Sequence, residues 1–192
     1  MAHKEKVRPV LEGITDAEGH RVLRALLARH PEFSAEAEAI ATTLASNVSR
    51  ERVASHVVAS VESLGLEELG ARSGRQLRGY VQAGEAAWEI LEKAVEPAII
   101  EIGRLLSFGL EAPARAQCEG VLLGLHALEV DHRSHELIEY APEFPGEAAA
   151  RALDVWFRGP GGPRTFDAAL LEELYEWAEL VSQVEGRTRG LR

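Results

Sequence analysis

The sequence of 192 residues lacks three features: it has only one cysteine, no apolar run close to 20 residues, and no basic and then apolar stretch at its start. One cysteine excludes an intramolecular disulfide framework. Apolar runs this short exclude a membrane-spanning helix, and the start of the chain lacks the features of a secretory signal. We therefore expect a cytoplasmic protein with no membrane among its partners.

Patterns typical of strands are also missing. No apolar stretch alternates with a period of two residues for long enough to predict a β-strand. Apolar residues instead recur at intervals of three and four, as they do in amphipathic helices, so we predict an all-α fold. A chain of this length can bury about 70% of its unfolded surface as one body. We expect a single domain over residues 1–192, with flexible ends at about 1–12 and 186–192.

Positive charge is scarce, with 21 lysines and arginines against 31 aspartates and glutamates and a formal net charge of −10. Proteins that bind nucleic acid in general do so through basic surfaces, which release counterions from the phosphate backbone. An acidic chain argues against this class of function. We expect no nucleic-acid partner.

Capping residues, prolines and apolar spacing divide the chain into segments. Thr15 and Glu18 fit a capping box, Ser34 and Ser49 are expected to cap the next two helices, and Gly186 to end the last one. We expect the first three helices to form a compact antiparallel start, and residues 71–84 to be irregular. The predicted helices cover residues 15–29, 34–48, 49–64, 84–109, 111–129, 134–141, 146–157 and 166–184, with at most one further turn at 66–69.

The stretch 84–109 is the longest amphipathic passage and the expected centre of the fold. Its first half carries apolar residues on one side and an acidic stripe on the other. Pro97 interrupts the phase of this pattern, so we predict a kink or a helix restart there, dividing the stretch into two halves. The acidic stripe consists of Glu85, Glu89, Glu92 and Glu96; the solvated face of a helix explains it, and so does a docking surface for a basic peptide or subunit.

One internal similarity links distant parts of the chain. Residues 26–37, LLARHPEFSAEA, match residues 137–148, LIEYAPEFPGEA, at a helix junction in both cases. The match favours a degenerate repeat of helix pairs, with an irregular helical bundle as the alternative.

A family resemblance extends this interpretation. The combination of LLARHPEF, SGRQLRGY followed by GEAAWEILEKAVEP, GVLLGLHAL and YAPEFPGEAAARALDVW resembles an uncharacterised group of bacterial helical proteins, similar in build to HEAT-like repeats. The resemblance covers about residues 15–157. It implies an α-α superhelix of HEAT-like helix pairs. It implies no functional residue, since the group has no assigned activity.

The best candidate for metal binding is the segment EVDHRSHELIE, residues 129–139. Glu129 and His132 have the Glu-x-x-His spacing that places two ligands on one helical face, His135 repeats the step, and Glu136 follows it. A second Glu-x-x-His and the motif His-Glu-x-x-His are both missing. The alternative is polar surface at a helix junction. We predict no cofactor.

A second candidate lies in the irregular segment before the central stretch. Arg72, Arg75, Arg78 and Tyr80 stand there among Ser73, Gly74 and Gly79, and guanidinium groups on flexible backbone suit a phosphate or carboxylate. The alternative is an ordered loop whose arginines pair with neighbouring acidic helices. No Gly-Lys-Ser/Thr ending marks a phosphate-binding loop.

Catalytic patterns are missing. There is no Gly-x-Ser-x-Gly elbow, and Cys118 shares the apolar face of Val121, Leu122 and Leu125, where a small buried residue is expected. Our main prediction is a non-enzymatic protein-interaction or scaffold domain, whose partner is another protein or a second copy. The alternatives are a metal-dependent enzyme or metal-binding protein using residues 129–139, and an anion-binding regulator using residues 72–80.

Overall fold

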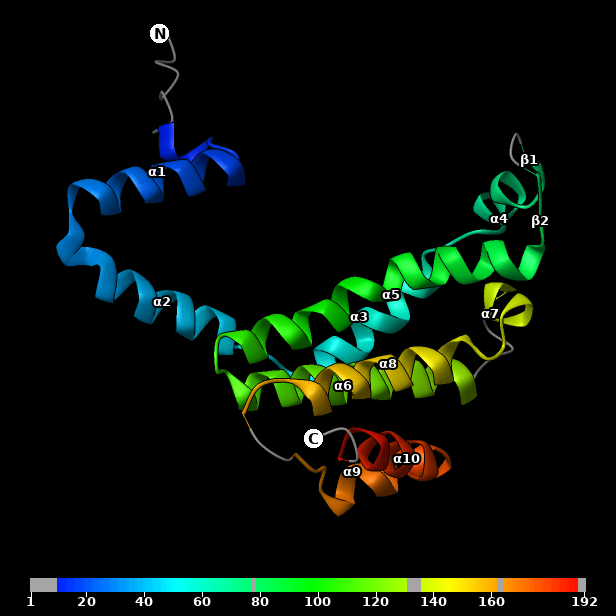
Figure 1. Ribbon diagram of the computed structural model, residues 1–192. Coiled ribbons are helices and arrows are strands. Elements are labelled where there is room, and N and C mark those ends of the chain that lie inside the picture. Colours follow the sequence, from blue (N-terminus) through cyan, green and yellow to red (C-terminus); the bar gives the residue numbers. More distant parts are fainter. Residues whose placement is uncertain (1–9, 77–78, 131–135, 162–163, 190–192) are drawn as a thin grey trace, which may run out of the picture. The chain divides into compact units, whose positions relative to one another are not determined.

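The computed structural model describes residues 10–76, 79–130, 136–161 and 164–189, and it confirms an all-α fold (Figure 1). The α-helices are α1 Asp16–Arg29, α2 Ser34–Ser46, α3 Arg50–Glu62, α4 Leu66–Arg72, α5 Ala83–Ser107, α6 Glu111–Val130, α7 Glu136–Tyr140, α8 Phe144–Arg158, α9 Ala168–Glu173 and α10 Ala178–Arg189. Short 3₁₀ turns are η1 Val10–Glu12, η2 Pro31–Phe33 and η4 Tyr175–Trp177. In the described chain, no helix is both long and apolar enough to cross a membrane.

Two of the three predicted N-terminal caps are confirmed. The Thr15 hydroxyl accepts from Glu18 N at 3.3 Å, and the Glu18 carboxylate accepts from Thr15 N at 2.9 Å, which completes the capping box. The Ser49 hydroxyl accepts from Arg52 N at 3.3 Å. Ser34 is instead the first residue of α2, because η2 leads directly into that helix.

The chain divides into two compact units, an N-terminal unit Met1–Leu44 and a C-terminal unit Ala45–Arg192. In the C-terminal unit α6 packs against α3, α5 and α8, and α10 lies on α8 (Figure 1). All the buried residues of the described chain belong to this unit. α3 therefore joins the α5–α6–α8 core, and the prediction that it forms a compact start with the first two helices is wrong.

Helices α3 and α6 approach each other closely because glycines face the contact. A Cβ at Gly120 would lie 2.5 Å from Val53 Cβ and 2.6 Å from Arg50 O, and one at Gly124 would lie 2.8 Å from Ala54 O. Such distances leave no room for a methyl group. The backbones can pack at this separation only with glycine at these two positions.

The central helix α5 runs unbroken through Pro97, so the predicted restart is wrong. Pro97 lies on the exposed side of the helix, where water can hydrate the carbonyl left without a proline N–H donor. An unbroken helix also explains Ile100, which is 60% exposed on the side of the acidic stripe. The expected apolar face of the second half is confirmed, because Ile99, Ile102, Leu105 and Leu106 are buried.

Two segments differ from the sequence-based expectation. Residues Gly74–Gln76 (β1) and Gly79–Val81 (β2) form a short antiparallel hairpin in the segment expected to be irregular, where no strand was predicted. The predicted last helix is divided into α9, η4 and α10. α10 continues past Gly186 to Arg189, so Gly186 is not the expected cap.

Candidate interaction surface

The amphipathic helix α1 leaves its apolar face uncovered. Val22, Leu23 and Leu26 are 44%, 45% and 44% exposed, and Leu27 is partly buried. With about 100° per residue, these four side chains occupy a band about 140° wide. The apolar residues recur at helical spacing, as the sequence predicted, but the helix buries none of its residues.

Helix α2 shows the same pattern. Ile40 and Leu44 lie one turn apart and are 55% and 72% exposed, and this helix also buries no residue. Phe33, in the connecting turn η2, is 43% exposed, and its ring lies near that of His30, with centroids 5.4 Å apart. We call Val22, Leu23, Leu26, Leu27, Phe33, Ile40 and Leu44 the N-terminal apolar surface.

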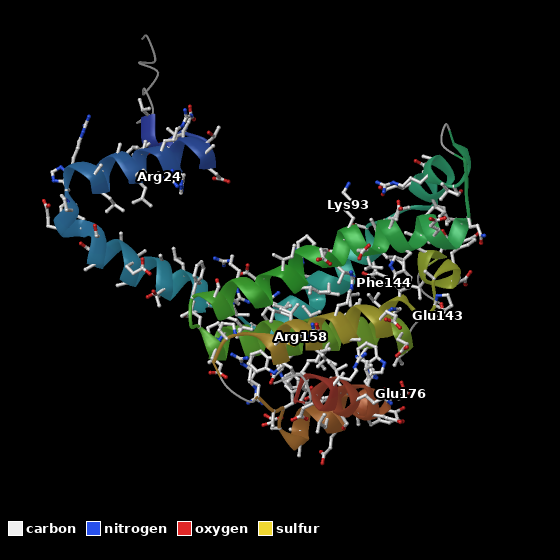
Figure 2. All side chains as sticks on the ribbon, viewed as in Figure 1. Arg24, Lys93, Glu143, Phe144, Arg158 and Glu176 are labelled. Carbon is white, nitrogen blue, oxygen red and sulfur yellow. The ribbon has the colours of Figure 1, made fainter. Side chains whose placement is uncertain are left out.

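Charges of opposite sign flank the two helical bands. On a helical wheel Arg24 and Arg29 lie just outside the two edges of the α1 band. On α2, Glu36 lies just outside Ile40, and Glu38 lies on the other side of the same face, beyond Leu44 and Ala41. Figure 2 shows Arg24 on α1. Arginines therefore flank the apolar band in the C-terminal half of α1, and glutamates precede the apolar pair in the N-terminal half of α2.

The two copies of the Pro-Glu-Phe motif differ in burial. Phe144, at the start of α8, is fully buried and meets the ring of Trp88 edge-on, with centroids 5.3 Å apart (Figure 2). Phe33 occupies the same position before α2 and is exposed. Both prolines stand at a helix junction, as expected. The aromatic ring is covered in the C-terminal unit and uncovered in the N-terminal unit.

The acidic stripe on α5 is partly engaged within the molecule. Glu92 accepts a hydrogen bond from Arg151 Nη1 on α8, and Glu96 Oε2 lies 3.5 Å from the same atom. Glu85 and Glu89 are exposed. The role of the stripe as a docking surface stays a prediction, and two of its four carboxylates already have a cationic neighbour.

A groove of about 820 Å³ begins beside this ion pair. Residues from α5, α8 and α10 line it, among them Ile99, Val155 and Arg187. Acidic and basic side chains alternate along its walls, and Arg158 Nε pairs with Asp154 at 2.8 Å. The mixed charge gives the groove no preference for a ligand of one sign.

The predicted anion site is described only in part. Arg72, at the end of α4, donates to Glu68 Oε1 at 2.9 Å, which agrees with the alternative that arginines of this segment pair with acidic helices. Arg75 and Tyr80 are paired in register across the β1–β2 hairpin. Arg78 lies outside the described residues. Anion binding by these residues stays a prediction.

The predicted metal site cannot be assembled from the described residues, because His132 and His135 lie outside them. Glu129 accepts a hydrogen bond from Trp177 Nε1, and Glu136 is exposed in the first turn of α7. Within the described ranges, no three His, Cys, Asp or Glu side chains are grouped for a metal ion. Metal binding stays a prediction.

Sequence reasoning missed the packing role of Glu129. The 3₁₀ turn η4 contacts two residues of α6, His126 and Glu129. His126 Nε2 lies 3.5 Å from Glu176 Oε2, and the His126 ring meets the Trp177 ring edge-on, with centroids 5.2 Å apart. The spacing of His126 and Glu129 places both on one face of α6. This cluster holds the C-terminal helices on the core.

Cys118 is fully buried on α6, as predicted. Burial raises the pKa of its thiol, because the charged thiolate loses its hydration. A nucleophilic cysteine needs an accessible thiolate, so Cys118 has the properties of a packing residue.

No protein-family model, no curated protein and no solved structure matches the chain. The resemblance to HEAT-like helical proteins, and with it the repeat of helix pairs, stays a prediction. α5 and α6 do form one pair, joined by a tight turn in which Gly109 has a φ of +73°.

Proposed function

We propose that this chain is a non-enzymatic protein-interaction domain that docks through its N-terminal apolar surface. The observation that carries the proposal is the exposure of this surface along two consecutive amphipathic helices. Monomeric proteins rarely expose contiguous apolar patches of more than a few hundred Å². A single exposed leucine needs no explanation, but two helices that bury nothing do.

The energetics of α1 and α2 support the same proposal. The helices have 14 and 13 residues, a length at which isolated helices are marginal in water. The capping box on α1 adds only about 1 kcal/mol. Burial of one leucine or isoleucine side chain contributes about 1.5–3 kcal/mol. A partner surface would therefore stabilise these helices more than any local feature of their sequence.

The C-terminal unit supports the proposal as a scaffold with its own core. Its helices cover their apolar faces among themselves, so its own fold does not depend on the partner. The free cysteine Cys118 accords with a reducing compartment, and we place the interaction in the cytoplasm.

Site-specific photo-cross-linking tests the proposal. A photoreactive amino acid replaces Leu26 in the full-length chain, which is irradiated in its native cells. We expect covalent adducts heavier than the chain, because Leu26 lies in the middle of the apolar band. The matched control carries the same group at Arg21, on the opposite side of α1, and should give few adducts. Equal yields at both positions, or none at Leu26, would contradict the proposal.

The acidic stripe is tested separately as a docking surface. A chain with Glu85, Glu89 and Glu92 changed to Lys carries the same photoreactive group at position 26. If the adducts persist at the yield of the unaltered chain, the stripe does not contribute to docking. A loss of adducts would assign the partner to both surfaces.

A further inference from the structure

We propose that the N-terminal apolar surface is covered by the same surface of a second copy of this chain. In this pairing α1 of each copy packs antiparallel along α2 of the other. The inference rests on the proposed function and names its partner. Such an arrangement has two-fold symmetry, the commonest symmetry of protein dimers, and every α1–α2 contact occurs twice.

Charge complementarity supports this pairing. Arg24 and Arg29 lie in the C-terminal half of α1, and Glu36 and Glu38 lie in the N-terminal half of α2. Antiparallel packing brings these two halves together and places the arginines of one helix near the glutamates of the other. A contact of α2 with α2 would bring no basic side chain beside these glutamates, since α2 has none. An antiparallel contact of α1 with α1 would place Arg24 and Arg29 near the acidic first turn of the other α1, and the charge-reversed chains below distinguish it from the pairing of α1 with α2.

The same chain does not supply the pairing in the described structure. α1 and α2 follow each other through η2, yet neither helix buries a residue. Within one described N-terminal unit, the apolar residues of α1 and α2 are therefore not buried against each other.

The described surface of the C-terminal unit offers no apolar band of matching chemistry. Its exposed large apolar residues are scattered over six different elements or element ends: Leu66, Ile100, Phe108, Val130, Tyr140 and Tyr175. Single apolar residues of this kind are usual on protein surfaces. A second N-terminal unit, in contrast, carries apolar residues on both helices, with arginines in the C-terminal half of α1 and glutamates in the N-terminal half of α2.

Sedimentation of the purified full-length chain gives the first test. We expect a reversible dimer, with twice the 20.9 kDa mass of the chain. Two charge-reversed chains are then compared with it. One carries Arg24→Glu and Arg29→Glu, and the other carries Glu36→Arg and Glu38→Arg. In each variant the charges at both α1–α2 contacts of the dimer repel instead of attract. We therefore expect the dissociation constant to rise about tenfold or more.

Weaker dimers could arise because charges repel between two copies, or because the substitutions damage each chain by itself. An equimolar mixture of the two charge-reversed chains distinguishes these causes. In the mixed dimer the charges attract at both α1–α2 contacts, so dimers should form with the affinity of the unaltered chain. A chain with all four substitutions should also form a dimer with itself if α1 pairs with α2, and should not if α1 pairs with α1. The substitutions place acidic residues near the C-terminus of α1 and basic residues near the N-terminus of α2, which disfavours both helices. A recovered dimer therefore cannot result from more stable individual helices.

The tryptophans provide a control for folding, because Trp88, Trp156 and Trp177 all lie in the C-terminal unit. Their emission should be the same in all variants. A monomeric unaltered chain, or a dimer that the charge reversals do not weaken, would overturn the inference. The proposed function has a separate outcome: adducts at position 26 with another protein, from a monomeric chain, would support docking and exclude the second copy as partner.

Discussion

At the scale of single residues, the most consequential polar side chain is Arg164. Its side chain is 3% exposed, and the guanidinium donates to the carbonyls of Trp156, Gly159 and Pro160. It also lies over the Trp156 ring, 5.0 Å from its centroid. The planar fork of an arginine can reach several carbonyls at once. This residue closes the turn that follows α8.

We predict that Arg164→Lys lowers the free energy of unfolding by about 2 kcal/mol, because a single ammonium nitrogen cannot occupy the positions of both Nη1 and Nη2, and buried unpaired groups are costly. The control is Arg158→Lys, whose side chain is 59% exposed and pairs with Asp154 one turn away. An exposed pair of this kind contributes at most about 0.5 kcal/mol. Denaturant unfolding followed by tryptophan emission measures both. Equal losses would show that the carbonyl contacts of Arg164 do not stabilise the fold.

At the scale of elements, helix faces could be predicted from the sequence and helix boundaries only in part. Leu170, Leu174, Trp177 and Val181 are buried as the spacing predicted, although the helix that should carry them is broken at η4. No proline or glycine marks this break. The contacts of Trp177 with α6, which are distant in sequence, accompany it. The spacing of apolar residues shows which side chains are buried. Contacts with residues distant in sequence, such as those of Trp177, leave no recognisable pattern in the local sequence.

Other elements show the same limit. The strands of the hairpin have three residues each, too few for a period of two to be recognised. At Pro97 the sequence showed a helix breaker but not the exposed side on which the proline lies. Of the candidate sites, the acidic stripe was predictable as a helix face, whereas its ion pair with Arg151 required the packing of α8 against α5.

The α3–α6 contact leads to a prediction at this scale. Gly120→Ala should lower the free energy of unfolding by about 1–2 kcal/mol, because the new methyl group would overlap Val53 and the carbonyl of Arg50. The gain in helix propensity, about 1 kcal/mol, is included in this value. Gly186→Ala in α10 is the control: its Cβ would meet nothing within 4 Å, so only the gain applies. Thermal unfolding of both variants measures the difference, and a Gly120→Ala chain as stable as the control would refute the close contact.

At the scale of the whole molecule, stability and interaction are assigned to different units. The C-terminal unit holds the core, and the N-terminal unit holds apolar helices without one. The sequence did not reveal this division, because the same spacing of apolar residues occurs in α1 and in α6. The spacing of apolar residues shows that a helix has an apolar face. It does not show whether the surface that packs on this face belongs to the same chain.

This division predicts that residues 45–192 fold alone. The shortened chain retains every buried residue of the described structure, so it should unfold cooperatively, with a midpoint within about 4 °C of that of the full-length chain under dilute conditions. It should also sediment as a monomer, because the N-terminal apolar surface is removed. The control is a full-length chain with Leu26→Glu and Ile40→Glu, which should match the shortened chain in both measurements. A much lower midpoint for the shortened chain alone would mean that residues 1–44 stabilise the core, and that their apolar faces are covered within one molecule.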